Sequence, residues 1–413
     1  ENLPFIWLLG GQHPDHSTLA RFFKANRKIM RALFKQTVQT SVEVGLVGFA
    51  LHAIDGTRVS AVSRDKTLTR EELLALDRRA EEVIAQLERS VEVEEKSGAA
   101  GPEALAMPAE LGNPVELRAR IQTALAEIDE RKAKKRGRRA KSVDPKTGQE
   151  RGPEVNLADP EAVVIKGSHG FVAGYNAQAA VDDKAYIIVA SDVVANADDH
   201  DALVPMVDEI KENLGRLADA TTCDGGYHST TNLRALATEN TDLYIADPEL
   251  KRHRSNPEKR AFHKDVFVHD PETDTYRCPA GQTLSLERVV TDPDDIHYGM
   301  RTYHCKQCRP CPHFGLCTKS KEGRTIHIGL DDALLRKNRE KMRSDDGKKK
   351  MKRRGATVEP VFGIIREHHG LTRFLRRGLE NVTAEWHLLC AAYNLKALWK
   401  DWCRRQECLA QAA

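Results

Sequence analysis

The chain has 413 residues, of which 40% are hydrophobic and 30% are charged, and its formal net charge is only +3. This length allows two or three domains with a substantial hydrophobic core. The small net charge excludes binding of nucleic acid by bulk charge, so any such binding must come from local basic clusters. No apolar run approaches the roughly 20 residues of a membrane-spanning helix, which excludes a helical membrane protein.

Residues 1–45 are expected to be helical. Ser17 is a suitable N-cap for the segment STLARFFKANRKIMRALFKQ, in which basic and apolar residues mix. Two interpretations remain open: an ordinary amphipathic helix, or the end of an N-terminal DNA-binding domain. The chain begins with Glu1 instead of Met and opens within a helical pattern, so we expect that its N-terminal part is missing.

A short apolar run near residues 48–55, FALHAID, ends in Asp55 and is followed by Gly-Thr. The pattern predicts a buried strand that ends at Asp55 and delivers it to the edge of a sheet. The alternative is that Asp55 is only a turn residue, because Asp before Gly is common in turns.

A helical insertion is expected at residues 66–158. Thr69 and Glu72 form a capping box, and apolar residues then recur at three- and four-residue spacing. A Gly/Ala/Pro-rich turn separates this helix from a second one, so the two are expected to pair as a hairpin.

The second helix runs into RKAKKRGRRAK, residues 131–141, in which eight of eleven residues are Lys or Arg. Such a run is either a solvated mobile segment or an arm that binds DNA phosphates. In the second interpretation Arg136, Arg138 and Arg139 contact DNA. The following loop contains Asp159, a reserve candidate for a site residue.

The next segments predict an α/β core. GYNAQAAVDDKAYIIVASDVV is expected to form a β-hairpin, followed by a helix at about 200–214 and a strand that leads to Asp224. A helix from Ser229 to about residue 240 and the strand DLYIAD complete the pattern, which is typical of a sheet flanked by helices. Asp224 precedes Gly-Gly and is either a second strand-end carboxylate or a turn residue.

Five of the nine cysteines crowd into one segment: Cys278, Cys305, Cys308, Cys311 and Cys317. The spacing C-x₂-C-x₂-C-x₅-C, with an upstream Cys-Pro, is typical of a structural zinc site. Five cysteines exceed four ligands, and His304 and His313 are rival ligands. The alternative is a set of reduced cysteines in a loop. Zinc would cross-link a segment expected to have little apolar content of its own.

Glu359 is expected in the first turn of a helix that Thr357 caps, where Pro360 is tolerated. A glutamate there often only complements the helix dipole. A basic stretch that includes Lys352, Arg353 and Arg354 precedes it, and is interpreted either as a set of phosphate contacts or as solvated helix faces. Two strand-end aspartates and one helical glutamate suit a pair of divalent metal ions.

Four blocks of the chain closely resemble DDE transposases of bacterial insertion sequences. They are LPFIWLLGGQHPDHSTLARFF, GYNAQAAVDDKAYIIVASDVV, the CDGGYHS block and VEPVFGIIREHHGLTRFLRRGLENVTAEWHLLCAAYNLKAL. The resemblance implies an RNase-H-like catalytic domain in which Asp55, Asp224 and Glu359 bind two Mg²⁺ ions. Arg366 matches a basic position where many relatives have Lys.

The family pattern also favours four of the cysteines as the structural zinc ligands: Cys278, Cys308, Cys311 and Cys317. The expected fold is an RNase-H-like mixed sheet flanked by helices, with a helical insertion, a Cys-rich insertion and an N-terminal helical segment. The expected parts are a DNA-binding remnant at 1–45, the first part of the core at 46–249, the Cys-rich insertion at 250–330 and the Glu-bearing part at 331–400.

The resemblance implies a transposase that cleaves double-stranded DNA at the element ends and joins them to target DNA. We expect a cytoplasmic, nucleoid-associated enzyme that acts as a homodimer. Two alternatives remain open: an inactive or truncated transposase-derived DNA-binding or zinc adaptor protein, and an RNase-H-like nuclease without strand transfer.

Overall fold

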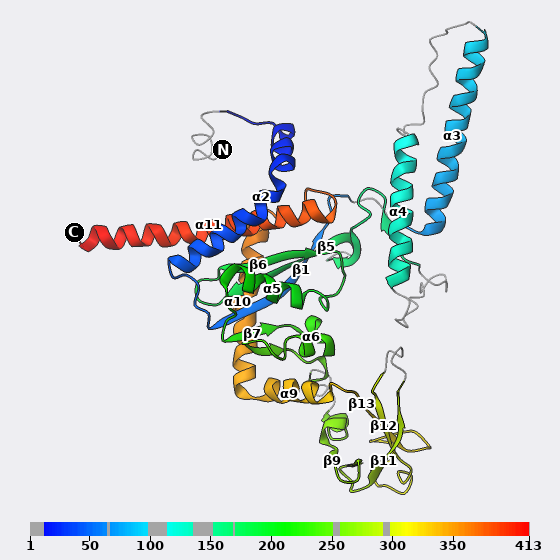
Figure 1. The fold of residues 1–413 in the computed structure, drawn as a ribbon, viewed down its shortest axis with the longest axis vertical. Coiled ribbons are helices and arrows are strands. Elements are labelled where there is room, and N and C mark those ends of the chain that lie inside the picture. The colour runs from blue at the N-terminus through cyan, green and yellow to red at the C-terminus, as the bar shows by residue number, and fades with distance from the viewer. Residues whose placement is uncertain are drawn as a thin grey trace.

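The computed structural model describes residues 12–63, 67–97, 114–134, 152–167, 170–250, 257–291 and 298–412. Its main sheet consists of β1 (Leu51–Ser60), β4 (Val163–Gly167), β5 (Gly170–Asp182), β6 (Ile188–Val194), β7 (Ala220–Cys223) and β8 (Asp242–Ile245). The strand order is β4-β5-β1-β7-β8, and β6 pairs with the other half of β5 (Figure 1). β1 is antiparallel to β5 and parallel to β7, so the fold is mixed α/β, and the predicted hairpin of β5 and β6 is confirmed.

The prediction that the first strand ends at Asp55 is wrong. β1 continues beyond Asp55 and stays paired with β5 as far as Ser60. Only the parallel pairing with β7 stops here, because its last register pair is Ile54 with Cys223. Asp55 therefore lies inside a strand, at the point where one of its two neighbours ends.

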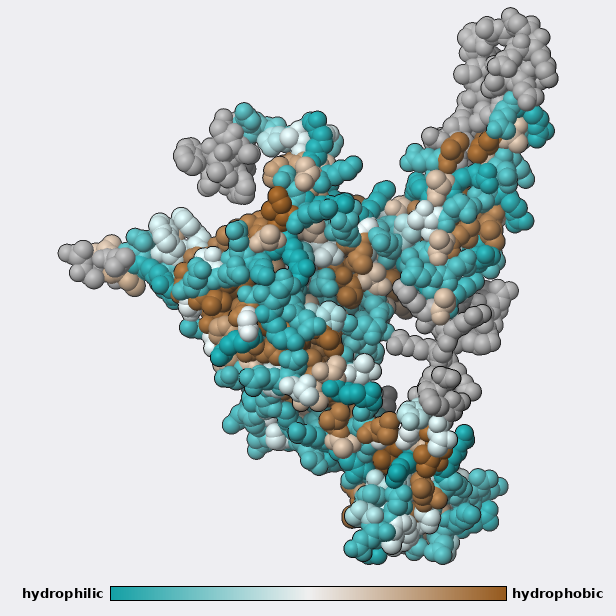
Figure 2. Space-filling model, in the orientation of Figure 1, coloured by the Kyte–Doolittle hydropathy of each residue, from teal (hydrophilic) through white to brown (hydrophobic). Residues whose placement is uncertain are grey.

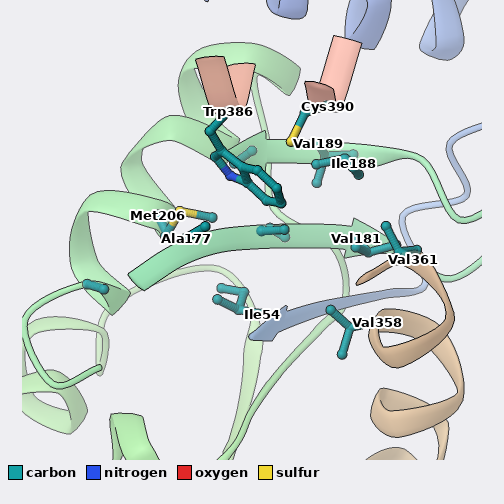
Figure 3. Packing of buried hydrophobic residues seen from close by; sticks show 14 of the residues in the cluster. Ile54, Ala177, Val181, Ile188, Val189, Met206, Val358, Val361, Trp386 and Cys390 are labelled. Carbon is teal, nitrogen blue, oxygen red and sulfur yellow. The ribbon is translucent and has the colours of Figure 1, made fainter. Parts of the chain in front are cut away.

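The helices that cover the sheet are α2 (His16–Glu43), α5 (Leu203–Leu214), α6 (Thr230–Ala235), α9 (Asp332–Arg343), α10 (Asp345–His368) and α11 (Leu379–Ala412). α10 packs on β1, β5 and β7, whereas α11 packs on β6 and on α2. Figure 3 shows the resulting core, in which Ile54 of β1, Val358 of α10 and Trp386 of α11 are fully buried. The indole Nε1 of Trp386 donates a hydrogen bond of 2.8 Å to the backbone oxygen of Gln178, which fixes α11 to β5.

Two helices begin at other residues than predicted. The N-cap of α2 is Asp15, whose side chain accepts from the Thr18 amide at 2.6 Å, so Ser17 lies in the first turn. The N-cap of α10 is Ser344, far upstream of Thr357, and Asp345 in its first turn complements the helix dipole. α6 begins at Ser229 as predicted, with Ser229 as its N-cap, but it ends at Ala235 and is shorter than expected.

Glu359 and Pro360 consequently lie deep inside α10 instead of at its start. The hydroxyl of Thr357 caps nothing, because it donates back to the Arg353 carbonyl oxygen at 2.9 Å. Pro360 has no N–H to give to the preceding turn. The helix continues through it because Val358 and Val361 are fully buried on either side.

The predicted helical hairpin is confirmed by α3 (Arg70–Ser97) and α4 (Pro114–Lys134), which project from the sheet (Figure 1). The capping box is present: the Thr69 amide donates to Glu72 at 2.7 Å, and the Glu72 amide donates to the Thr69 hydroxyl at 3.3 Å. The hairpin has its own apolar cluster, made of Leu73, Ile121, Ala124, Leu125, Ile128 and Val155. The short pair β2 (Thr67–Leu68) and β3 (Val155–Asn156) closes its base.

The Cys-rich segment forms a second, antiparallel sheet in the order β13-β12-β11-β10-β9. Its strands are β9 (Val268–Asp270), β10 (Thr275–Arg277), β11 (Thr283–Val289), β12 (Arg301–Cys305) and β13 (Arg324–Ile328). The expectation of little apolar content is wrong, because seven buried residues form a core here: Phe267, Tyr276, Leu284, Tyr303, Cys305, Cys308 and Ile326.

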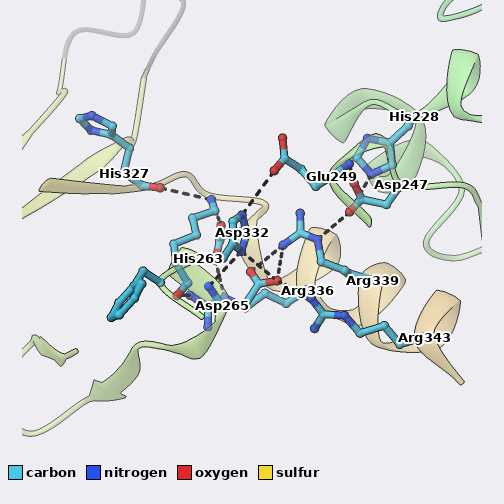
Figure 4. A network of polar contacts seen from close by, with 12 residues as sticks. His228, Asp247, Glu249, His263, Asp265, His327, Asp332, Arg336, Arg339 and Arg343 are labelled. Carbon is cyan, nitrogen blue, oxygen red and sulfur yellow. Dashed lines mark hydrogen bonds and ion pairs between the residues drawn. The ribbon is translucent and has the colours of Figure 1, made fainter. Parts of the chain in front are cut away.

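A buried polar network ties this second sheet to α9 (Figure 4). The Arg339 guanidinium is only 3% exposed and donates to Asp247, at the end of β8, at 2.7 Å, and to Asp265 at 2.6 Å. Burial alone would raise the pKa of Asp265, but hydrogen bonds from His263 and Arg339 hold it well below its usual range. Removing one partner of a buried ion pair costs about 3–5 kcal/mol. The network therefore anchors the Cys-rich sheet to the helix that leads into α10.

The face of the molecule in Figure 2 is largely hydrophilic, with hydrophobic residues visible over the core and at the Cys-rich sheet. Among the described helices, none is both long and apolar enough to cross a membrane.

Candidate active site

Asp55 and Asp224 lie side by side where β7 ends. Both residues follow directly after the last parallel register pair of β1 and β7, and both are partly buried. Burial raises the pKa of Asp55, the nearby charge of Asp224 raises it further, and Arg354 opposes both. Two neighbouring carboxylates raise the pKa of one of them unless a nearby cation stabilises both charges.

The cation present at this position is the guanidinium of Arg354. Its Nη1 donates to Asp55 Oδ2 at 2.8 Å, and its side chain is 14% exposed. Burial lowers the pKa of Arg354, but Asp55 and Asp224 outweigh it and raise that pKa. Sequence reasoning assigned Arg354 to DNA, whereas its guanidinium here stands in for a positive ion at the paired acids.

The backbone at Asp224 is held rigidly. The Asp224 side chain accepts from the Gly226 amide at 2.7 Å and caps the short 3₁₀ turn η1 (Gly225–Tyr227). Tyr227 is fully buried, and its hydroxyl donates to the Gln178 side chain on β5. The Asp-Gly-Gly turn is thus anchored to the far side of β1, which fixes where the Asp224 carboxylate lies.

Glu359 is an exposed residue of α10, and its carboxylate is not joined to the aspartates. Arg366, two helical turns further along the same face, donates to the Thr57 hydroxyl on β1. The Glu359 side chain is exposed and folds back along its helix, since an ideal Cβ on Gly355 would lie 3.1 Å from Glu359 Oε1. Within the described residues, no hydrogen bond or ion pair links Glu359 to Asp55 or Asp224.

A metal fits this donor set only after two side chains move. In the part of the chain that the structure describes, no three His, Cys, Asp or Glu side chains stand close enough together to hold a metal ion. The oxygens of Asp55 and Asp224 are the hard ligands that Mg²⁺ prefers. Arg354 already shows that a cation is stable against them, so the site fits once the guanidinium leaves and Glu359 turns inward.

Sequence reasoning missed a third aspartate at this edge, Asp199, in the segment between β6 and α5. Its Oδ1 accepts from Asn176 Nδ2 at 2.7 Å and from Gln178 Nε2 at 3.0 Å. Its Oδ2 lies against Gly226. The only signal in the sequence was the acidic run NADDHD after a strand, which is equally typical of a solvated loop.

The C-terminal part of the chain matches a known family. Residues 277–399, from β10 into α11, match the family model described as the transposase DDE domain. These residues belong to the transposase DDE domain family. The match contains Glu359 and Arg366 and confirms the resemblance to DDE transposases, whereas Asp55 and Asp224 lie upstream of it. No curated protein matches the chain.

The reserve candidate Asp159 is engaged in contacts away from Asp55 and Asp224. It is 1% exposed, and its Oδ1 accepts from the Tyr175 hydroxyl at 2.7 Å and from the Gly378 amide at 3.1 Å. Burial raises its pKa. Its carboxylate therefore ties the loop before α11 to β5.

The other basic candidates fall into two groups. Arg353 donates to the Asp183 carboxylate at 3.1 Å, and Lys352 is exposed on the same turn of α10. Arg136, Arg138 and Arg139 lie outside the described residues.

All five clustered cysteines line one pocket of the Cys-rich sheet, together with His313. Two backbone amides point at thiol sulfurs, from Gln282 to Cys278 and from Arg324 to Cys308, each at 3.3 Å. The rival ligand His304 does not line this pocket, because its ring contacts the Glu322 carbonyl oxygen at 2.9 Å. Burial raises the pKa of the Cys305 thiol to about 11.

Proposed function

We propose that this protein is a transposase that cleaves DNA and joins the freed ends to target DNA. The observation that carries the proposal is the pair Asp55 and Asp224 at the end of β7, beside a helix whose Glu359 belongs to a transposase DDE domain. An RNase-H-like core is supported by a central β1 that is antiparallel to β5 and parallel to β7, with α10 packed across them.

Asp55, Asp224 and Glu359 are the residues that would hold two Mg²⁺ ions. When bound, such a pair activates the attacking oxygen and stabilises the leaving 3′-oxygen of an in-line displacement at phosphorus. Water is the nucleophile for cleavage, and the freed 3′-hydroxyl is the nucleophile for joining. Both steps have the same geometry at phosphorus, so one set of carboxylates serves both.

The arginines of α10 supply the charges that face DNA. If Asp55 held a metal ion, Arg354 would lose its partner, and its guanidinium would be available to a phosphate in the bidentate geometry that suits arginine. Arg366, held by the Thr57 hydroxyl, orients a second phosphate from the same helix. Lys352 and Arg353 extend this basic face toward the start of α10.

Double-stranded DNA is the implied partner, as element end and as target. We infer that residues 1–45 belong to a DNA-binding domain, that the protein acts as a homodimer on DNA in the nucleoid, and that its gene belongs to a bacterial insertion sequence. The domain boundaries at 45, 249 and 330 remain predictions.

We also propose one structural zinc ion in the Cys-rich sheet, held by Cys278, Cys308, Cys311 and Cys317. The pocket and the two amide–sulfur hydrogen bonds support it, because N–H donors stabilise thiolate charge. The cysteines have to draw closer for tetrahedral coordination, since no described group stands at ligand spacing.

One observation favours an inactive DNA-binding derivative as the alternative. Arg354 forms an ion pair with Asp55, and the Glu359 carboxylate lies against Gly355 of its own helix. An enzyme must release that ion pair on binding metal and DNA, whereas an inactive derivative keeps it.

The test is cleavage and joining by the full chain on linear DNA that carries its gene and flanking sequences, with Mg²⁺ and a supercoiled target plasmid. Asp55→Asn, Asp224→Asn and Glu359→Gln should each lower cleavage by at least about 100-fold, because each removes charge stabilisation at phosphorus. DNA binding should stay nearly unchanged. Asp345→Asn, an 88% exposed acid on the same α10, is the matched control and should cleave like the wild type.

Three outcomes would contradict the proposal. Normal cleavage by Asp55→Asn would make Asp55 a structural residue only. Cleavage without joining would identify a nuclease. DNA binding without any cleavage by the wild type would identify an inactive derivative.

A further inference from the structure

We propose that Asp199 is a fourth carboxylate of the acidic site and binds the divalent cation beside Asp224. This inference rests on the proposed function and adds a fourth residue to the three proposed acids; like Asp55 and Asp224, it lies upstream of the matched residues.

The first observation is the space that two glycines leave for the Asp199 carboxylate. An ideal Cβ on Gly226 would lie 2.6 Å from Asp199 Oδ2 and 3.0 Å from Asp224 Oδ1. Because both distances start from the same point, Asp199 Oδ2 and Asp224 Oδ1 cannot lie further apart than the two distances added together. An ideal Cβ on Gly56, the neighbour of Asp55, would lie 2.6 Å from Asp199 Oδ1. The Asp199 carboxylate thus lies close to both Asp-Gly motifs, and at Gly56 the side chains of Asn176 and Gln178 share the same space.

The second observation is the orientation of the carboxylate. Asn176 is 2% exposed and Gln178 is fully buried, and both donate to the same oxygen, Oδ1. These two strand residues fix the plane of the group. The other oxygen, Oδ2, is thereby directed to Gly226 and to the side where Asp224 stands.

The third observation is charge. Burial raises the pKa of the Tyr227 hydroxyl well above its usual value, and the carboxylates of Asp199, Asp55 and Asp224 all add to that shift. The charges of all three acids therefore act on the same buried hydroxyl. Arg354 is bonded to Asp55, whereas among the described residues no Lys or Arg forms an ion pair with Asp199. A carboxylate held by neutral amides beside a second carboxylate suits a bound cation.

A structural role makes a different prediction. If Asp199 only ordered Asn176 and Gln178, its loss would weaken the fold and leave cation binding unchanged. The two roles are separated by measuring cation affinity and metal-free stability on the same variants.

The experiment is titration of the DNA-free full chain with Mn²⁺, read by electron paramagnetic resonance. Asp199→Asn and Asp224→Asn should each weaken Mn²⁺ binding by about 10-fold or more, with Asp345→Asn as an unchanged control. Gly226→Ala keeps every charge but fills the space at Asp199 Oδ2, so it should weaken Mn²⁺ binding as well. Melting temperatures without metal report on folding.

Wild-type Mn²⁺ affinity in Asp199→Asn, together with weakened binding in Asp224→Asn, would overturn the inference and leave the proposed function standing. Unchanged affinity in Asp55→Asn and Asp224→Asn as well would overturn the metal site of the proposed function itself.

Discussion

Glu209 illustrates how a single buried side chain sets the pH response of the fold. It lies on α5 at 8% exposure, and its Oε2 accepts from the Ser191 amide at 3.1 Å. Burial, with the nearby charge of Asp192, raises the pKa of Glu209 to about 8. The charge of Arg31 opposes this shift but does not cancel it.

This shift predicts how stability changes with pH. Between pH 4.5 and about 8 the unfolded chain releases a proton that folded Glu209 keeps, so the free energy of unfolding falls as pH rises. Glu209→Gln removes the titration and keeps the acceptor for Ser191. Its melting temperature should exceed that of the wild type at pH 8 and differ little at pH 4.5.

The control for this prediction lies one turn further along α5. Glu212 is half exposed, and hydrogen bonds from Lys35 and the charge of Arg31 lower its pKa, so Glu212→Gln should not raise stability at pH 8. Melting temperatures that change with pH in the same way for the wild type and Glu209→Gln would refute the assignment of this pH dependence to Glu209.

At the scale of elements, the sequence predicted what depends on local pattern. The capping box at Thr69, the strand into Asp224 and the β5-β6 hairpin each depend on residues close together in the chain, and each is present. The start of α10 was misplaced because Ser344 and the acids after it stand within a basic stretch, whose charges obscure the capping signal. Asp199 was missed because its role depends on glycines that are distant in the chain.

The prediction at the scale of elements is that the Cys-rich sheet binds zinc. Purified protein should contain about one zinc ion, because four thiolates suit zinc. Cys308→Ser and Cys317→Ser should each lose it and lower the melting temperature of this sheet. Cys408→Ser, an exposed cysteine on α11, is the matched control and should keep the metal. Elemental analysis that finds no metal in freshly reduced wild-type protein would exclude the zinc site.

At the scale of the whole molecule, the α3/α4 hairpin and the Cys-rich sheet both project from the main sheet and its helices (Figure 1). The paired acids lie on the core at the end of β7, and α10 carries basic residues past them. DNA long enough to reach past the core could therefore meet more than one part of the chain. The basic run at 131–141 begins in the last turn of α4, so it is attached to one of these projections.

If that run contacts phosphates, replacing Arg136, Arg138 and Arg139 with Ala should weaken binding to all DNA sequences alike, because phosphate contacts carry no sequence information. The slope of log affinity against log salt should fall by about 0.9 for each DNA phosphate that is no longer neutralised. The same removal of charge at Arg78, Arg79 and Arg89, exposed on α3, is the control and should leave the slope unchanged. Binding titrations at several salt concentrations give both slopes. Equal slopes for this variant and the wild type would mean that the basic run at 131–141 contacts solvent and not DNA phosphates. The basic residues of α10 would then have to supply the affinity for DNA.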